Sequence, residues 1–131
     1  MLQLTSMVKI CDRSGVVLAQ CIKVLGSRKN RTANLGGLML VSVKRINVFR
    51  LSLIKPRIRK KFQLGTLHRV LLLRSQVNFQ RQPYAYVRFN ENAGLIVNRR
   101  RIPVSNRFFG PLVREFSFRW PWLGCISRNF V

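Results

Sequence analysis

Acidic side chains are almost absent from this chain. Of its 131 residues only Asp12, Glu91 and Glu115 carry a carboxylate side chain, and only His68 carries an imidazole. General acid–base catalysis needs paired groups with tuned pKa values, and the positive charge around these carboxylates is expected to hold them ionised. The sequence therefore predicts that the protein is not an enzyme, and His68 is interpreted as an ordinary strand or turn residue.

Cysteine is scarce too. Cys11, Cys21 and Cys125 form no Cys-x-x-Cys pair, which argues against a zinc ribbon or knuckle. Cys11 and Cys21 fall in apolar segments, so we interpret them as small buried hydrophobes, with no disulfide framework. The glycine-rich loop of P-loop proteins and the dinucleotide fingerprint are also missing. We expect no metal and no cofactor.

Long apolar runs are lacking as well. The longest uninterrupted stretch of apolar residues and glycine is Leu35–Val41, whereas a membrane-spanning helix needs about 20 residues. The first residues show no apolar signal core with a cleavage site and no Arg- and Ser-rich amphipathic extension. The sequence predicts no membrane insertion and a single domain over residues 1–131.

Positive charge dominates what is present. Lysine and arginine number 25, the formal net charge is +22, and 47% of the residues are hydrophobic. A chain this apolar can bury a core, and one this basic indicates a polyanionic partner. Arginine outnumbers lysine 18 to 7, and its planar donors suit phosphates and bases. Nucleic acid is the first candidate partner and an anionic membrane the second.

Short aliphatic and β-branched runs separated by turn residues predict an all-β barrel or sandwich. The Asp12–Gly15 segment reads as a tight turn. The alternation in Leu38–Ile46 places Met39, Val41 and Val43 on one face. The expected strands are Met7–Cys11, Val16–Leu25, Leu38–Ile46, Leu67–Arg74, Tyr84–Phe89 and Leu95–Asn98.

Two further segments have other patterns. Asn47–Leu64 holds five positive charges in the seven residues Lys55–Lys61 around Pro56, and is read as an extended basic loop that lies along phosphates or is simply solvated. Pro111 suits the first turn of a helix and Pro121 would end it, which predicts one short C-terminal helix. Trp120 and Trp122 nearby are interpreted as packing anchors.

The Tyr84–Phe89 segment alternates cleanly, so Tyr84, Tyr86 and Arg88 share one face. Such a stripe can stack bases, although aromatic residues on strands more often pair across a sheet. A free-standing single-strand nucleic-acid binder therefore stays as the alternative function.

Four segments in order along the chain resemble the universal large-subunit ribosomal protein of the L-fourteen family. They are Cys11–Gly15 (similar to Ala-Asp-Asn-Ser-Gly), Cys21–Gly26, Val87–Ala93 (similar to Ile-Arg-Phe-Asp-Asp-Asn-Ala) and Arg107–Phe116 (similar to Arg-Ile-Phe-Gly-Pro-Val-x-Arg-Glu-Leu). The resemblance implies a small five-stranded OB-like barrel with a short C-terminal helix. It implies a structural, non-catalytic component of the large ribosomal subunit that is not a homo-oligomer.

The family's partners follow from the same resemblance. They are large-subunit rRNA, small-subunit rRNA at an intersubunit bridge, and neighbouring large-subunit proteins resembling L-three and L-nineteen. Silencing factors bind this family at a Thr-Arg pair that corresponds to Asn106 and Arg107 here.

The chain departs from the family pattern at several points. Pro83-Tyr84 replaces an Asp-Gly turn, Leu123 replaces a lysine, Lys44-Arg45 replaces Lys-Glu, and Asn47–Leu64 is longer and more basic. Such drift looks organellar, which predicts the mitochondrial matrix, with the bacterial cytoplasm or another organelle as alternatives.

The candidate rRNA-binding residues are the basic side chains expected on loops and strand ends. They are Arg13, Lys23, Arg28, Lys29, Arg31, Lys44, Arg45, Arg57, Arg59, Lys60, Lys61, Arg74, Arg81, Arg88, Arg99, Arg100, Arg101 and Arg107.

Overall fold

A computed structural model describes residues 2–26, 32–127 and 129–131. Five strands form a closed barrel: β1 (Met7–Ile10), β2 (Val16–Leu25), β3 (Leu38–Ile46), β4 (Leu67–Arg74) and β7 (Ala93–Val97). Neighbouring strands are antiparallel from β1 round to β7, and a parallel β1–β7 pairing closes the barrel. The predicted five-stranded barrel is confirmed, and the ranges predicted for β2, β3 and β4 agree with the structure.

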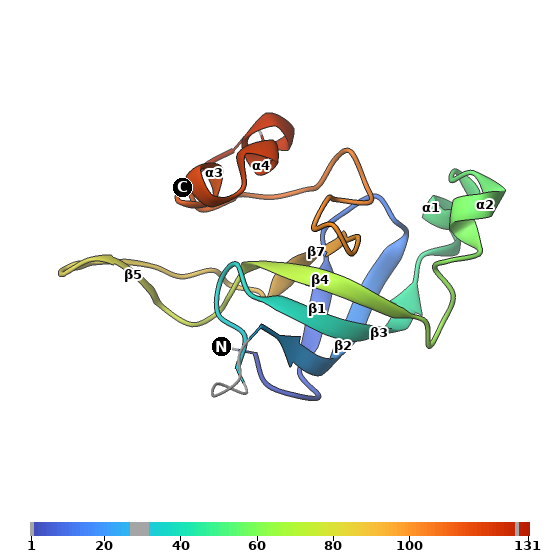
Figure 1. Ribbon diagram of the computed structural model, residues 1–131, viewed down its shortest axis with the longest axis horizontal. Helices are drawn as coiled ribbons and strands as arrows, with labels where there is room; N and C mark the ends of the chain where they lie inside the picture. Colours follow the sequence, from blue (N-terminus) through green and yellow to red (C-terminus); the bar gives the residue numbers. More distant parts are fainter. Residues whose placement is uncertain (1, 27–31, 128) are drawn as a thin grey trace.

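The barrel carries three appendages (Figure 1). Strands β5 (Phe79–Gln82) and β6 (Ala85–Val87) form a separate hairpin that projects from one end of the long axis. Helices α1 (Val48–Ser52) and α2 (Pro56–Arg59) lie at the opposite end, and α3 (Phe116–Arg119) and α4 (Pro121–Ile126) lie along one side.

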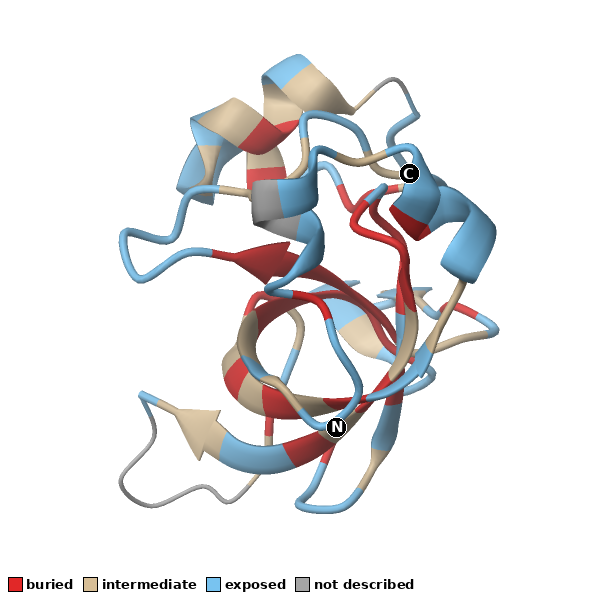
Figure 2. Cartoon of the chain, turned by 90° about the vertical axis from the view of Figure 1, so that its right-hand side faces the viewer, coloured by how far each residue is buried: buried red, intermediate tan, exposed pale blue. Residues whose placement is uncertain are grey.

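Strand β4 shows how one barrel supports two cores. Val70 and Leu72 point into the barrel interior, whereas Leu71 and Leu73 belong to a second cluster with Leu123 of α4. Successive side chains point to opposite faces of a strand, so β4 is buried on both faces over the apolar run Val70–Leu73. Figure 2 shows the buried residues concentrated on the barrel strands and beneath the C-terminal helices.

Strand β7 is buried along its whole length as well. Gly94 is required there because a Cβ would lie 2.3 Å from Cγ1 of Val70 across the pairing. In β3 the residues predicted to share one face, Met39, Val41 and Val43, are buried.

The segment after β3 is helical rather than an extended loop, which corrects the sequence-based expectation for Asn47–Leu64. The Asn47 side chain accepts hydrogen bonds from the N–H groups of Phe49 and Arg50 and so caps α1. Pro56 begins α2 instead of breaking a helix, which agrees with the preference of proline for a first helical turn. Leu51 of α1 joins the barrel core.

The expected C-terminal helix is also different in detail. Leu112, next to Pro111, forms a β-bridge with Phe130, and the helix α3 begins only at Phe116. Pro121 ends α3 and at the same time starts α4. Trp120 and Trp122 pack against the second core cluster, as predicted.

The segment expected as strand Tyr84–Phe89 is shorter and lies outside the barrel. It is β6, which pairs with the unexpected strand β5 through a two-residue turn at Pro83-Tyr84. The predicted alternation is confirmed, since Tyr84, Tyr86 and Arg88 are exposed and Phe89 is buried.

Candidate nucleic-acid interface

All three acidic side chains of the chain are bonded within it. Asp12 is buried and accepts hydrogen bonds from the N–H and hydroxyl of Ser14 and from the N–H of Ile96. Burial raises the pKa of Asp12 above its ordinary value despite these bonds. At Asp12 the loss of hydration therefore acts against the positive field, which was expected to favour the ionised form.

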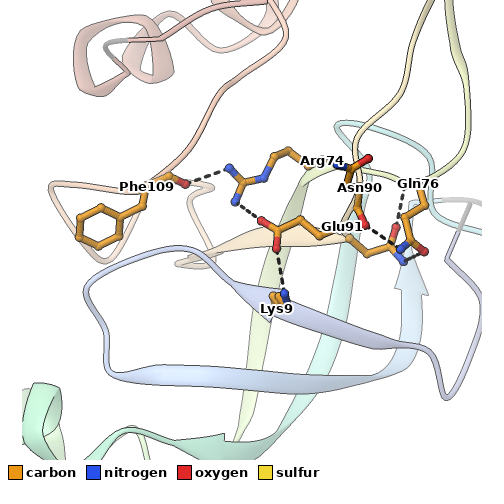
Figure 3. A network of polar contacts seen from close by, with 7 residues as sticks. Lys9, Arg74, Gln76, Asn90, Glu91 and Phe109 are labelled. Carbon is orange, nitrogen blue, oxygen red and sulfur yellow. Dashed lines mark hydrogen bonds and ion pairs between the residues drawn. The ribbon is translucent and has the colours of Figure 1, made fainter.

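Glu91 forms the centre of a polar network (Figure 3). Its carboxylate lies 3.0 Å from Nζ of Lys9 and 3.1 Å from Nη2 of Arg74. The Arg74 side chain is only 7% exposed, and its Nη1 donates to the Phe109 carbonyl oxygen at 3.0 Å. The Arg74 guanidinium thus joins β4 to the loop after β7, and it is not presented at the surface for RNA as the sequence suggested.

Glu115 pairs with Arg81 of β5. Nε of Arg81 donates to Oε1 of Glu115, and Nη2 donates to Oε2 at 2.9 Å. The hydrogen bond from Arg81 lowers the pKa of Glu115. This pair connects the β5–β6 hairpin to the C-terminal segment, and it occupies a second arginine that was predicted to bind RNA.

His68 and the cysteines have structural surroundings. Nε2 of His68 lies 2.9 Å from the Lys61 carbonyl oxygen, and its ring packs against Phe62. Cys11 and Cys21 are buried, as predicted, and burial raises the pKa of Cys11 to about 12. Cys125 is exposed.

Three segments meet at the end of the barrel from which α1 leaves. The N–H of Asn47 donates to the Gly15 carbonyl at 2.8 Å, and the N–H of Arg13 donates to Oγ of Ser105 at 3.3 Å. The N–H of Phe109 donates to the Cys11 carbonyl at 2.8 Å. These bonds bring the β1–β2 turn, the start of α1 and the loop after β7 together.

This junction places one arginine of the β1–β2 turn and one arginine of α1 beside an aromatic ring of the loop after β7. The guanidinium carbons of Arg13 and Arg50 each lie 5.8 Å from the centroid of the Phe109 ring. Arg13, Asn106, Arg107 and Phe109 also line a polar cavity of about 400 Å³, which we call the Arg13 cavity. The structure thus brings Arg13 together with Asn106 and Arg107, the residues expected at an interface.

The other candidate basic residues are not among the described residues that line the Arg13 cavity. Those with exposed side chains are Lys23 on β2, Lys44 and Arg45 on β3, Arg59, Lys60 and Lys61 around the end of α2, Arg88 after β6, and Arg99, Arg100 and Arg101 after β7. Arg28, Lys29 and Arg31 and the side chain of Arg57 lie outside the described residues.

The sequence did not single out Arg50 or Lys9. Asn47 is a good helix-capping residue, so a helix that starts after it and includes Arg50 could have been predicted from the sequence. The pairing of Lys9 with Glu91 joins residues 82 positions apart, and no local signal indicates such a contact.

Over the described part of the chain, no three His, Cys, Asp or Glu residues gather in a possible metal site. No helix there is long and apolar enough to cross a membrane. The family model described as ribosomal protein L14p/L23e matches residues 1–131, the whole chain.

Proposed function

Because this chain belongs to the ribosomal protein L14p/L23e family and so has a structural, non-enzymatic role in the large ribosomal subunit, we propose that it binds large-subunit rRNA through its exposed basic side chains. It acts as one domain over residues 1–131 and needs no cofactor. Positioning contacts to phosphates and RNA shape dominate over base reading, as is usual for folded RNA.

One observation carries this proposal. All three carboxylate side chains have partners within the fold: Asp12 accepts hydrogen bonds from Ser14 and Ile96. Glu91 pairs with Lys9 and Arg74, and Glu115 pairs with Arg81. The remaining basic side chains in the described ranges have no carboxylate partner. A net charge of +22 that the fold itself does not neutralise calls for a permanent polyanion.

The proposed contacts are the exposed candidates at the barrel ends and loops. The set is Arg13, Lys23, Lys44, Arg45, Arg59, Lys60, Lys61, Arg88, Arg99, Arg100, Arg101 and Arg107. Arg28, Lys29, Arg31 and Arg57 belong to the proposal on sequence alone.

Salt dependence tests the proposal. Each phosphate neutralised on a duplex steepens the plot of log K against log salt by about 0.9, so the purified chain should bind a large-subunit rRNA fragment with a slope of several units. A slope near zero would show that basic contacts do not drive binding.

The protein further contributes to an intersubunit bridge through Asn106 and Arg107, and neighbouring large-subunit proteins contact it. Both residues are exposed and border the Arg13 cavity, where a second RNA has access to them. Changing Arg107 to Gln should reduce the association of large with small subunits at low magnesium while leaving the chain in the large subunit. Unchanged subunit association would remove Arg107 from the bridge.

The location we propose is the ribosome of the mitochondrial matrix. The support is the loss of acidic residues relative to the family pattern, as at Lys44-Arg45. Fractionation of cells with an antibody against the chain tests it, since signal in cytoplasmic ribosomes alone would contradict a mitochondrial location.

A single-strand nucleic-acid binder is the second candidate. Tyr84 is 97% exposed and Tyr86 is 59% exposed on the projecting hairpin, so both rings are free to stack on bases.

A further inference from the structure

The guanidiniums of two arginines from different parts of the chain lie over the ring of Phe109. Arg13 lies in the β1–β2 turn and Arg50 in α1, and each guanidinium carbon is 5.8 Å from the ring centroid. The two cations are therefore within twice that distance of each other. The ring itself is 48% exposed, so a ligand has access to this cluster.

The backbone of Phe109 is held on both sides. Its N–H donates to the Cys11 carbonyl at 2.8 Å, and its carbonyl oxygen accepts from Nη1 of Arg74 at 3.0 Å. The next residue, Gly110, has φ of +98°, and a Cβ there would lie 1.6 Å from Nη1 of Arg74. The network of Figure 3 thus fixes the point from which the ring projects.

An aromatic ring orders a cation without neutralising it. A guanidinium is attracted to the face of a ring within about 6 Å, whereas a carboxylate would orient it and also cancel its charge. Neither Arg13 nor Arg50 forms an ion pair with any described residue. Asp12, beside Arg13 in sequence, is buried and bonded to Ser14 and Ile96.

We propose that Phe109 holds Arg13 and Arg50 as a two-arginine clamp for the phosphodiester backbone of RNA. This inference rests on the proposed function and adds Arg50 and the uncharged Phe109 to its binding machinery. The clamp borders the Arg13 cavity, which Arg107 and Asn129 also line, and both residue types carry side-chain donors. Arginine suits this role because its fork of donors bridges phosphate oxygens.

The test compares the salt slopes of variants on one large-subunit rRNA fragment. The double variant Arg13→Gln, Arg50→Gln should lower the slope by about 1.8, the value for two phosphates. Phe109→Leu removes no charge, and it should nevertheless lower the slope by at least about 0.9, because the guanidiniums lose their common platform. Phe109→Tyr, which keeps the aromatic face, should restore the original slope.

Phe118→Leu is the matched control. Phe118 lies on α3 and is 84% exposed, and no cation is recorded over its ring within the described residues. Its substitution should leave the slope unchanged. An unchanged slope for Phe109→Leu, with a steep slope for the unaltered chain, would overturn the clamp and leave rRNA binding intact. A slope near zero for the unaltered chain would overturn rRNA binding itself.

The reactivity of Cys125 gives an independent test of whether RNA occupies the Arg13 cavity. It lines the Arg13 cavity together with Phe109, and it is the exposed cysteine of the three. The rRNA fragment should slow the alkylation of Cys125 by iodoacetamide severalfold, and inorganic phosphate should not. Equal protection by inorganic phosphate would identify a free anion site and contradict a backbone clamp.

Discussion

At the scale of single residues, Gly110 and Arg74 show how a buried cation shapes a surface loop. The Arg74 guanidinium fills the space that a side chain at position 110 would need. It also bonds to Glu91 and to the Phe109 carbonyl, so it cannot move aside without losing both interactions. The sequence predicted a surface role for Arg74 because no local sequence pattern indicates that it pairs with the distant Glu91.

Gly110→Ala should therefore destabilise the protein by about 3 kcal/mol, which combines positive-φ strain with the loss of bonds to a charged group. Gly65→Ala is the control, since Gly65 also has a positive φ of 79° but, its chain neighbours aside, no atom of the described residues lies within 4 Å of a Cβ there. That control should cost only about 1 kcal/mol. Urea unfolding measures both, and equal losses would mean that Arg74 does not restrict the loop.

The raised pKa of Asp12 has a consequence for stability. Unfolded aspartate titrates near about 3.9, and the folded protein holds this proton more tightly. The free energy of unfolding of the native chain should fall, relative to that of Asp12→Asn, as the pH rises from about 4 and should level once the pH passes the native pKa.

Comparison with Asp12→Asn separates Asp12 from Glu115, whose lowered pKa has the opposite effect on stability. Unfolding by urea at a series of pH values gives the difference directly. A difference that rises with pH would show that the hydrogen bonds from Ser14 and Ile96, rather than burial, dominate the Asp12 carboxyl.

At the scale of elements, the β5–β6 hairpin decides between the two candidate functions. Tyr84 and Tyr86 are exposed, so replacing both with alanine should change the free energy of unfolding by no more than about 0.5 kcal/mol. Binding of a single-stranded oligoribonucleotide should change little, because barrel-end cations carry the affinity. A stacking platform would instead lose about 1–3 kcal/mol per base, which fluorescence anisotropy would detect.

The barrel strands could be predicted because the local pattern of apolar residues matches their pattern of burial. Buried residues alternate along the first part of β3, and β4 contains the apolar run Val70–Leu73, which is buried on both faces. Strand β5 could not be predicted, since Phe79–Gln82 has one apolar residue and pairs with β6 outside the barrel. The prolines were harder to interpret: Pro56 starts α2, no helix starts at Pro111, and Pro121 ends α3 as predicted but also starts α4.

The site could be predicted only in part. Arg13, Asn106 and Arg107 were identified in the sequence, but their meeting at one cavity depends on how the β1–β2 turn and the loop after β7 fold together. The contact between Arg50 and Phe109 was not predicted, because residues 59 positions apart share no local sequence pattern that would indicate it.

At the scale of the whole molecule, the few acidic side chains all have structural roles. Each carboxylate fixes a junction: Asp12 orders the β1–β2 turn, Glu91 joins the segment between β6 and β7 to β1 and β4, and Glu115 anchors the β5–β6 hairpin. The basic appendages lie at both ends of the long axis (Figure 1). Positive charge thus covers an elongated body whose own negative groups are all committed to its fold.

Sedimentation of the native chain with ribosomal subunits tests the central claim most directly. After subunits are separated at low magnesium and washed in high salt, the chain should remain with the large subunit, because many phosphate contacts act together on a folded RNA. Recovery of the chain free in the supernatant, or with membranes, would contradict the account.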